Sequence, residues 1–163
     1  MKRLFVDLEI CSNCPKCIVE CSYFYHPQNN GITSLREYAT FSLVCRQCKE
    51  APCVNSCYHN ALEKQTDGIL KRYTFLCTSC KSCSIACPFG VIMPEFIEYL
   101  DSKCDFCIGK PEEIPLCVKS CPYKAVDLKE IEEDPLNNIY FVGKALAVHS
   151  RKWIKEDILP KKK

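Results

Sequence analysis

Sixteen cysteines dominate the chemistry that this 163-residue sequence could carry. They fall into four groups of four, and each group opens with Cys-x2-Cys and closes with Cys-x3-Cys. Because no cysteine is left over, the repeat indicates one kind of site that is used four times. In chain order the groups are Cys11, Cys14, Cys17 and Cys21; Cys45, Cys48, Cys53 and Cys57; Cys77, Cys80, Cys83 and Cys87; and Cys104, Cys107, Cys117 and Cys121.

Thiolates at these spacings favour iron–sulfur chemistry. Groups one and three have the Cys-x2-Cys-x2-Cys-x3-Cys run of bacterial 4Fe–4S ligation, in which the fourth cysteine ligates a second cluster. We expect that fourth cysteine at the start of a helix, pointing away from the other three. Zinc is the alternative metal, but structural zinc sites pair two Cys-x2-Cys knuckles across a loop, which the dense triplets at 11–17 and 77–83 fit poorly.

Composition and charge limit where the protein works and what it binds. Residues 1–10 contain no apolar stretch as long as that of a signal peptide, and no segment approaches the roughly 18–20 apolar residues of a membrane-spanning helix. We therefore expect a cytoplasmic protein without membrane insertion, in which cysteines bind metal rather than form disulfides. A partner with its own export signal could still carry the folded chain across a membrane. The formal net charge of +2 falls to about −6 with sixteen thiolates and four clusters of charge about 2+, so no nucleic-acid partner is expected.

The sequence contains no constellation for catalysis by the chain itself. It has five glycines and no Gly-rich loop for a nucleotide, and no Cys-x2-Cys is followed by the histidine that covalent haem needs. His26, His59 and His149 stand apart from any serine or aspartate constellation. We therefore expect no catalytic residue and no chemistry beyond that of the clusters.

Short elements must position the cysteines, which predicts an α+β fold. Apolar residues alternate from Leu4 to Ile10 and predict a strand that leads into Cys11. Asp67-Gly68 predicts a hairpin within 62–75. Beside the cysteines, we expect Ile18, Val54, Ile85 and Val118 to shield the clusters.

Residues 129–163 form a C-terminal extension. Ile139–Val142 predicts a strand, and Lys144–Leu159 has a weak helical periodicity with Trp153 on its apolar side. We predict that this strand and helix dock on a partner, although covering the chain's own modules explains them equally well.

The residues around the cysteines resemble those of bacterial-ferredoxin-type, four-cluster electron-transfer subunits of multisubunit oxidoreductases. The resemblance covers about residues 4–128. The matching segments are Cys45-Arg46-Gln47-Cys48 with Ala51-Pro52-Cys53, Ala61-Leu62 with Asp67-Gly68-Ile69, Ala86-Cys87-Pro88-Phe89-Gly90-Val91-Ile92, Lys103-Cys104-Asp105-Phe106-Cys107, and 117–125. Within them Tyr58 stands where proline often follows the fourth cysteine, and Thr78-Ser79 replaces the usual apolar-glycine pair.

The resemblance implies two interleaved bacterial-ferredoxin-like modules, each holding two 4Fe–4S clusters, within a domain of residues 1–128. The inner module would span about 40–95, and the outer module 1–39 plus 96–128. The implied ligand sets are Cys45, Cys48, Cys53 and Cys87; Cys77, Cys80, Cys83 and Cys57; Cys11, Cys14, Cys17 and Cys121; and Cys104, Cys107, Cys117 and Cys21. The hairpin between groups two and three agrees with this nested pairing, but the spacing also permits a tandem pairing of group one with two and group three with four.

The resemblance also implies the function. A non-catalytic subunit would relay single electrons through four 4Fe–4S clusters between a larger catalytic subunit and a second electron donor or acceptor protein. The catalytic subunit would be a molybdenum or tungsten pterin enzyme, such as an aldehyde or formate oxidoreductase, or a hydrogenase or carbon monoxide dehydrogenase. The shortness of the chain favours such soluble partners over exported respiratory reductases. The alternatives are a free polyferredoxin that shuttles electrons, and a zinc or redox-sensing module.

Overall fold

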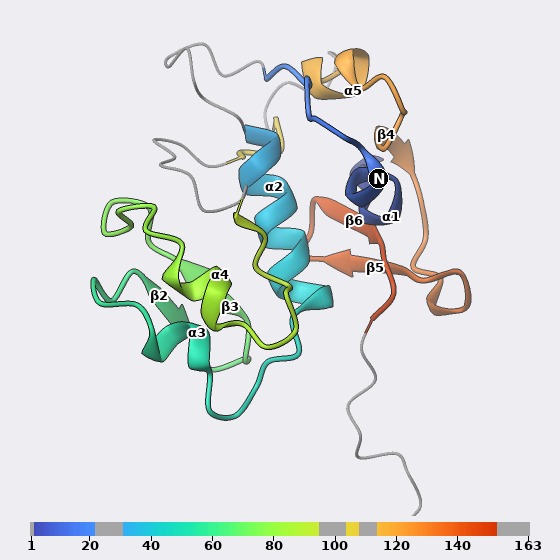
Figure 1. Ribbon diagram of the computed structural model, residues 1–163. Helices are drawn as coiled ribbons and strands as arrows, with labels where there is room; N and C mark the ends of the chain where they lie inside the picture. Colours follow the sequence, from blue (N-terminus) through green and yellow to red (C-terminus); the bar gives the residue numbers. More distant parts are fainter. Residues whose placement is uncertain (1, 22–30, 95–103, 108–113, 153–163) are drawn as a thin grey trace, which may run out of the picture.

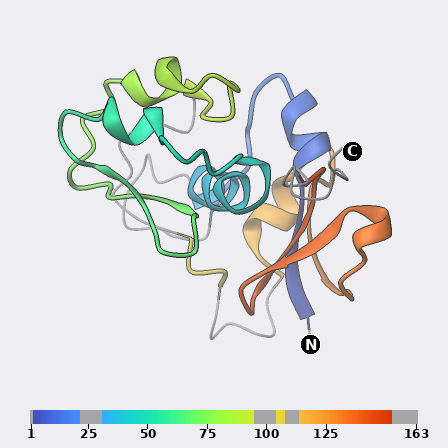
Figure 2. The ribbon, with the colours of Figure 1, turned by 90° about the horizontal axis from the view of Figure 1, so that it is seen from below.

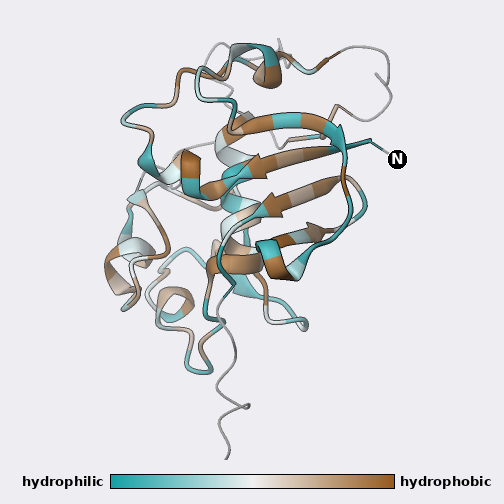
Figure 3. Ribbon diagram, turned by 90° about the vertical axis from the view of Figure 1, so that its right-hand side faces the viewer, coloured by the Kyte–Doolittle hydropathy of each residue, from teal (hydrophilic) through white to brown (hydrophobic). Residues whose placement is uncertain are grey.

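A four-stranded sheet joins segments from both ends of the chain (Figures 1 and 3). The computed structural model describes residues 2–21, 31–94, 104–107 and 114–152. The strand order is β4 (Val126–Glu130), β1 (Lys2–Asp7), β6 (Leu146–His149) and β5 (Ile139–Val142). β1 pairs antiparallel with β4 and parallel with β6, and β5 and β6 form an antiparallel hairpin.

Helix α1 (Leu8–Asn13) follows β1 directly, because Asp7 caps it. The Asp7 carboxylate accepts a hydrogen bond of 2.9 Å from the backbone N–H of Ile10. The predicted N-terminal strand is therefore confirmed as far as Asp7, but it is wrong beyond that residue, and Cys11 lies within a helix.

A longer helix, which the sequence analysis did not predict, lies at the centre of the molecule. α2 (Gly31–Ala39) continues into a π-helical turn, η1 (Thr40–Val44). It runs between the sheet and the segment of residues 45–94, as Figures 1 and 2 show. That segment contains α3 (Pro52–Asn55), β2 (Leu62–Lys64), β3 (Leu70–Arg72) and α4 (Ser82–Ala86).

The predicted hairpin is confirmed, since β2 and β3 pair antiparallel. The Asp67 carboxylate accepts a 2.9 Å hydrogen bond from the N–H of Ile69 in the turn. Gly68 has a φ of +86°, a conformation that costs glycine little, and a Cβ atom there would lie 2.9 Å from the side-chain oxygen of Gln47.

Two short elements complete the described fold. α5 (Leu116–Ser120) precedes β4, and the 3-10 turn η3 (Pro135–Asn137) precedes β5. Over the stretches of chain that the structure describes, no helix combines the length and apolar character needed to span a membrane.

The buried apolar side chains form two clusters, which we call the sheet cluster and the hairpin cluster. Cysteines of groups one and four pack against the sheet cluster, and cysteines of groups two and three belong to the hairpin cluster or pack against it. The sheet cluster consists of Leu4, Val6, Leu8, Ile32, Leu35, Ala39, Leu43, Val126, Val142, Leu146 and Val148. The hairpin cluster consists of Phe41, Cys53, Leu62, Leu70, Cys83 and Ile92.

The C-terminal extension belongs in part to the chain's own sheet. The strand predicted at Ile139–Val142 is confirmed as β5. The helix predicted over Lys144–Leu159 is wrong at Leu146–His149, which form β6, and its residues from Trp153 onward lie outside the described residues. The physical reason is that β6 lies between β1 and β5, where a run of three apolar side chains is buried, and such a run suits an inner strand.

We predict that truncation after Asn138 unfolds the sheet. The truncation removes β5 and β6, and each buried leucine or valine lost, such as Leu146 and Val148, contributes about 1.5–3 kcal/mol to the free energy of folding. Limited proteolysis followed by mass spectrometry should therefore detect new cleavage within β1 and β4.

Truncation after Lys152 is the matched control, because it leaves all four strands in place. The control should keep the proteolysis pattern of the full-length protein. Protection of β1 in the variant that ends at Asn138 would contradict this account of the sheet.

Candidate metal centres

The same backbone turn recurs inside three of the Cys-x2-Cys segments. The residue before the second cysteine has a positive φ in each case: 51° at Gln47, 56° at Ser79 and 57° at Phe106. This turn directs a backbone N–H toward the sulfur of the preceding cysteine. The N–H of Gln47 donates to Cys45 Sγ, and the N–H of Phe106 donates to Cys104 Sγ, both at 3.4 Å. Ser79 therefore adopts, with a side chain, the conformation for which glycine is usual.

The Cys-x3-Cys segments of groups two, three and four are short helices. α3, α4 and α5 each begin one residue before the third cysteine of a group and end before the fourth. Cys87 and Cys121 are the C-caps of α4 and α5, so the prediction that the fourth cysteine begins a helix is wrong. A tight turn follows each of these helices, with a positive φ three residues after the fourth cysteine, at Asn60, Gly90 and Lys124.

Group one departs from this pattern. Its Cys-x2-Cys segment ends helix α1, with Cys14 as the C-cap, and the backbone N–H of Cys14 donates to the Cys11 carbonyl at 3.3 Å. Cys11 therefore depends on the Asp7 cap for its position.

One hollow is lined by Cys45, Cys48, Cys53 and Cys87. It thus brings the first three cysteines of group two together with the last of group three. Lys64 also lines it, and its Nζ donates to the carbonyl oxygens of Gln47 at 2.9 Å and Cys48 at 2.7 Å. The lysine ties the cysteine loop to β2 and places a positive charge beside these sulfurs.

A second hollow is lined by Cys11, Cys14, Cys17 and Cys121. It brings the first three cysteines of group one together with the last of group four. Arg36 of α2 lines this hollow, and its charge acts on the Cys11 thiol.

The remaining cysteines also have electrostatic neighbours both in their own group and in another group. Cys77 of the same group and Cys57 of group two both raise the pKa of Cys83. Cys107 of the same group and Cys21 of group one raise the pKa of Cys117. Cys21 also raises the pKa of Cys104. In each case the fourth cysteine of one group lies near cysteines of another group.

Burial makes several of these thiols difficult to ionise. It raises the pKa of Cys104 to about 12 and that of Cys11, Cys83 and Cys117 to about 11. Nearby cysteine sulfurs raise each pKa further, because adjacent thiolates repel one another. A bound cation reverses this effect, since a coordinating thiol is deprotonated outright. The donor sets therefore fit a metal group that brings its own positive charge.

Cys80 differs from the other fifteen cysteines, because it is the one that is exposed. Its Sγ lies 3.4 Å from Ser82 Oγ, and the hydrogen bond with Ser82 lowers the pKa of the Cys80 thiol.

The arrangement of sulfurs distinguishes a cluster from a single ion. Among the described residues, no group of three or more His, Cys, Asp or Glu side chains is placed to hold one metal ion. Four thiols that surround a hollow without converging on a point fit a multi-iron cluster better than a tetrahedral zinc, whose four sulfurs lie about 2.3 Å from one centre.

The residues predicted to shield the clusters behave in two ways. Val54 and Val118 are partly buried and pack against the hairpin and sheet clusters. Ile18 and Ile85 are 62% and 85% exposed, and Ile18 lines the second hollow.

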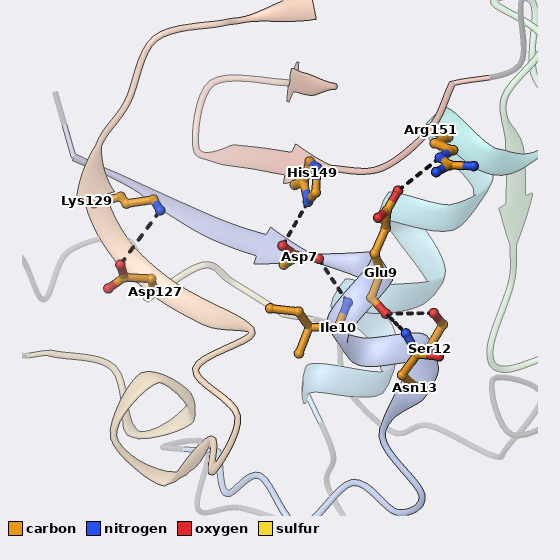
Figure 4. Close-up of polar contacts among 9 residues, drawn as sticks. All are labelled: Asp7, Glu9, Ile10, Ser12, Asn13, Asp127, Lys129, His149 and Arg151. Atoms are coloured by element: carbon orange, nitrogen blue, oxygen red, sulfur yellow. Dashed lines mark hydrogen bonds and ion pairs between the residues drawn. The ribbon is translucent and has the colours of Figure 1, made fainter. Parts of the chain in front are cut away.

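Sequence reasoning missed the charged neighbours of the cysteines. No local sequence pattern identifies Lys64 and Arg36 as neighbours of the cysteines, since only the fold brings them to the hollows. His149, which the sequence analysis treated as isolated, has its Nδ1 atom 2.8 Å from Asp7 Oδ2 (Figure 4). This contact joins β6 to the cap of α1. His59 is exposed and packs edge-on against the Tyr58 ring, whereas His26 lies outside the described residues.

Three relatives illustrate the proteins that this chain is similar to. It is 30% identical over 148 residues to the candidate electron transport protein YsaA of Escherichia coli (strain K12), covering 82% of this chain and 93% of YsaA. It is 29% identical over 152 residues to the B subunit of the anaerobic dimethyl sulfoxide reductase of the same organism, covering 79% and 73%. It is 30% identical over 137 residues to the uncharacterized ferredoxin MJ0265 of Methanocaldococcus jannaschii, covering 82% and 75%.

Two protein families match the sequence directly. Residues 36–131 match the family described as "4Fe-4S dicluster domain", and residues 8–23 match the one described as "4Fe-4S binding domain". The first match spans more than half of the chain and includes three of the four cysteine groups, and the second includes the remaining group. The chain therefore belongs to the ferredoxin-type 4Fe–4S dicluster family.

Proposed function

We propose that the protein is a non-catalytic electron-transfer subunit that binds four 4Fe–4S clusters through all sixteen cysteines. The observation that carries the proposal is that the fourth cysteine of each group lies near cysteines of another group. The proposed ligand sets are Cys45, Cys48, Cys53 and Cys87; Cys57, Cys77, Cys80 and Cys83; Cys11, Cys14, Cys17 and Cys121; and Cys21, Cys104, Cys107 and Cys117.

The chain's own residues hold and adjust these sites. When bound, each cluster supplies the ability to take up or release one electron. The N–H groups of Gln47 and Phe106 donate to cysteine sulfurs, which favours the negative charge on the ligands. Lys64 and Arg36 add positive charge at two of the sites, and the apolar side chains around the hollows limit access of water.

The two clusters of buried apolar side chains support a division into two modules. We propose an inner module around the hairpin cluster, at about residues 40–95, and an outer module around the sheet cluster, from 1–39 plus 96–128. In this proposal β5 and β6 of the C-terminal extension complete the sheet of the outer module.

A larger catalytic subunit is the proposed partner. One relative is a component of a dimethyl sulfoxide reductase, which supports a place beside a redox enzyme. The catalytic subunit would be of the molybdenum or tungsten pterin class, or a hydrogenase or carbon monoxide dehydrogenase, and a second protein would exchange electrons at the other end. Cys80 supports an exchange point at its set, because it is the one exposed cysteine.

A free ferredoxin that shuttles between enzymes is the second candidate function, since another relative is named a ferredoxin. Anaerobic purification from the native source separates the two. We expect the protein to elute with a larger subunit that carries a further cofactor. Elution of the fully metallated protein alone would favour the shuttle.

We predict about sixteen iron and sixteen acid-labile sulfide per chain in the anaerobically purified protein, as four cubane clusters require. Elemental analysis with a colorimetric sulfide assay measures both. One to four zinc ions without sulfide would remove the electron-transfer function.

We further predict that Cys45→Ser and Cys87→Ser disrupt the same cluster. Each single variant should lose up to about four irons, and the double variant should lose no more than either single one. The matched control is Cys45→Ser with Cys83→Ser, which should lose about twice as much because two sets are affected. Tandem pairing predicts the additive loss for Cys45→Ser with Cys87→Ser instead.

A further inference from the structure

A buried ion pair joins the central helix to the hairpin. Arg72 of β3 donates from Nε to Glu37 Oε1 at 2.8 Å and from Nη2 to Glu37 Oε2 at 2.6 Å. The two side chains are only 2% and 10% exposed. This bidentate contact fixes the plane of the guanidinium.

Stability alone is a weak reason for such a pair. Removing two charges from water costs about as much as their attraction returns, so apolar residues of similar volume often serve equally well. The Arg72 guanidinium, however, has five N–H donors. Glu37 accepts from its Nε and Nη2 atoms, which carry only part of this set. Cys77 lies one turn beyond Arg72, since its backbone N–H donates to the Tyr73 carbonyl at 3.1 Å, and its sulfur interacts with the Arg72 guanidinium.

Cys77 is the first cysteine of group three, which the proposed function assigns to the set with Cys57, Cys80 and Cys83. The pair therefore places a permanent positive charge against one sulfur of this set, inside the protein, where solvent screens it little. Glu37 places a compensating negative charge against the same guanidinium.

We infer that Glu37 and Arg72 together set the reduction potential of the cluster at Cys57, Cys77, Cys80 and Cys83, an inference that rests on the proposed function. Reduction adds one electron to a site that already carries negative charge. The Arg72 cation stabilises the reduced form and raises the potential, whereas Glu37 holds the guanidinium against Cys77 and partly offsets its charge. The two residues thus act in opposite directions.

The experiment is a redox titration, monitored by electron paramagnetic resonance, of the complete anaerobically purified protein. The signal of this cluster is identified as the one that Cys57→Ser removes. We expect Arg72→Met to lower the ratio of reduced to oxidised cluster at a fixed potential by about tenfold, which is about 59 mV for one electron. Glu37→Gln, which keeps volume and a hydrogen-bond acceptor, should change the ratio in the opposite direction.

Lys71→Met is the matched control. Lys71 is the neighbouring residue of the same strand and is exposed, so its removal changes the same charge in a screened position. The control should change the ratio by less than about twofold. Arg72→Lys keeps the positive charge without the planar guanidinium. Its ratio of reduced to oxidised cluster should lie between those of the wild type and Arg72→Met.

If the arginine variants lose this cluster, the reduction potential of the cluster in Glu37→Gln tests the inference. Shifts of Arg72→Met and Glu37→Gln in the same direction would mean that the pair is only structural, and an unchanged potential in Glu37→Gln with full iron content would likewise overturn the inference. Failure of the proposed function looks different, because the wild-type protein would then lack iron and sulfide.

Discussion

Several of the sulfurs in this protein are buried where they cannot easily become thiolates, and the rest of the structure depends on that constraint. The pKa of Cys104 is about 12, whereas thiolate is the form that binds metal. Burial of these groups as thiolates, the form that binds metal, is stable only when a cation compensates their charge. Because Cys87 lies with 45–53 and Cys121 with 11–17, a cluster bound at either hollow would also join segments that are far apart in the chain. Such cross-links would add the order that two small apolar side-chain clusters provide only in part.

The central helix is the element that both halves share. Ile32 and Leu35 of α2 belong to the sheet cluster, whereas Phe41 in the π-helical continuation belongs to the hairpin cluster. Adjacent residues on a helix point about 100° apart, so Arg36 lines the second hollow, whereas Glu37 contacts Arg72 of the hairpin. One turn of α2 therefore contacts both parts of the described fold.

Local patterns in the sequence predicted the local structure well. Cysteine spacing predicted the short repeats, Asp67-Gly68 the hairpin and Ile139–Val142 a strand. Prediction failed where distant contacts decide. The apolar run of β6 is helical in periodicity but is held as a strand between β1 and β5, and the Glu37–Arg72 pair spans 35 positions. No local pattern announces such a pair, because each partner alone is an ordinary charged residue that usually lies at the surface.

The parallel pairing of β1 with β6 imposes an order on biosynthesis. Asp7 and His149 meet across the sheet although 142 positions separate them, so β1 cannot complete its pairing with β6 until residue 149 has left the ribosome. At typical translation speeds this delay is on the order of ten seconds. During that time Cys11 and Cys17 lack the sheet cluster against which they later pack. The nascent chain thus presents the thiols of Cys11 and Cys17 before the sheet that later covers them is complete.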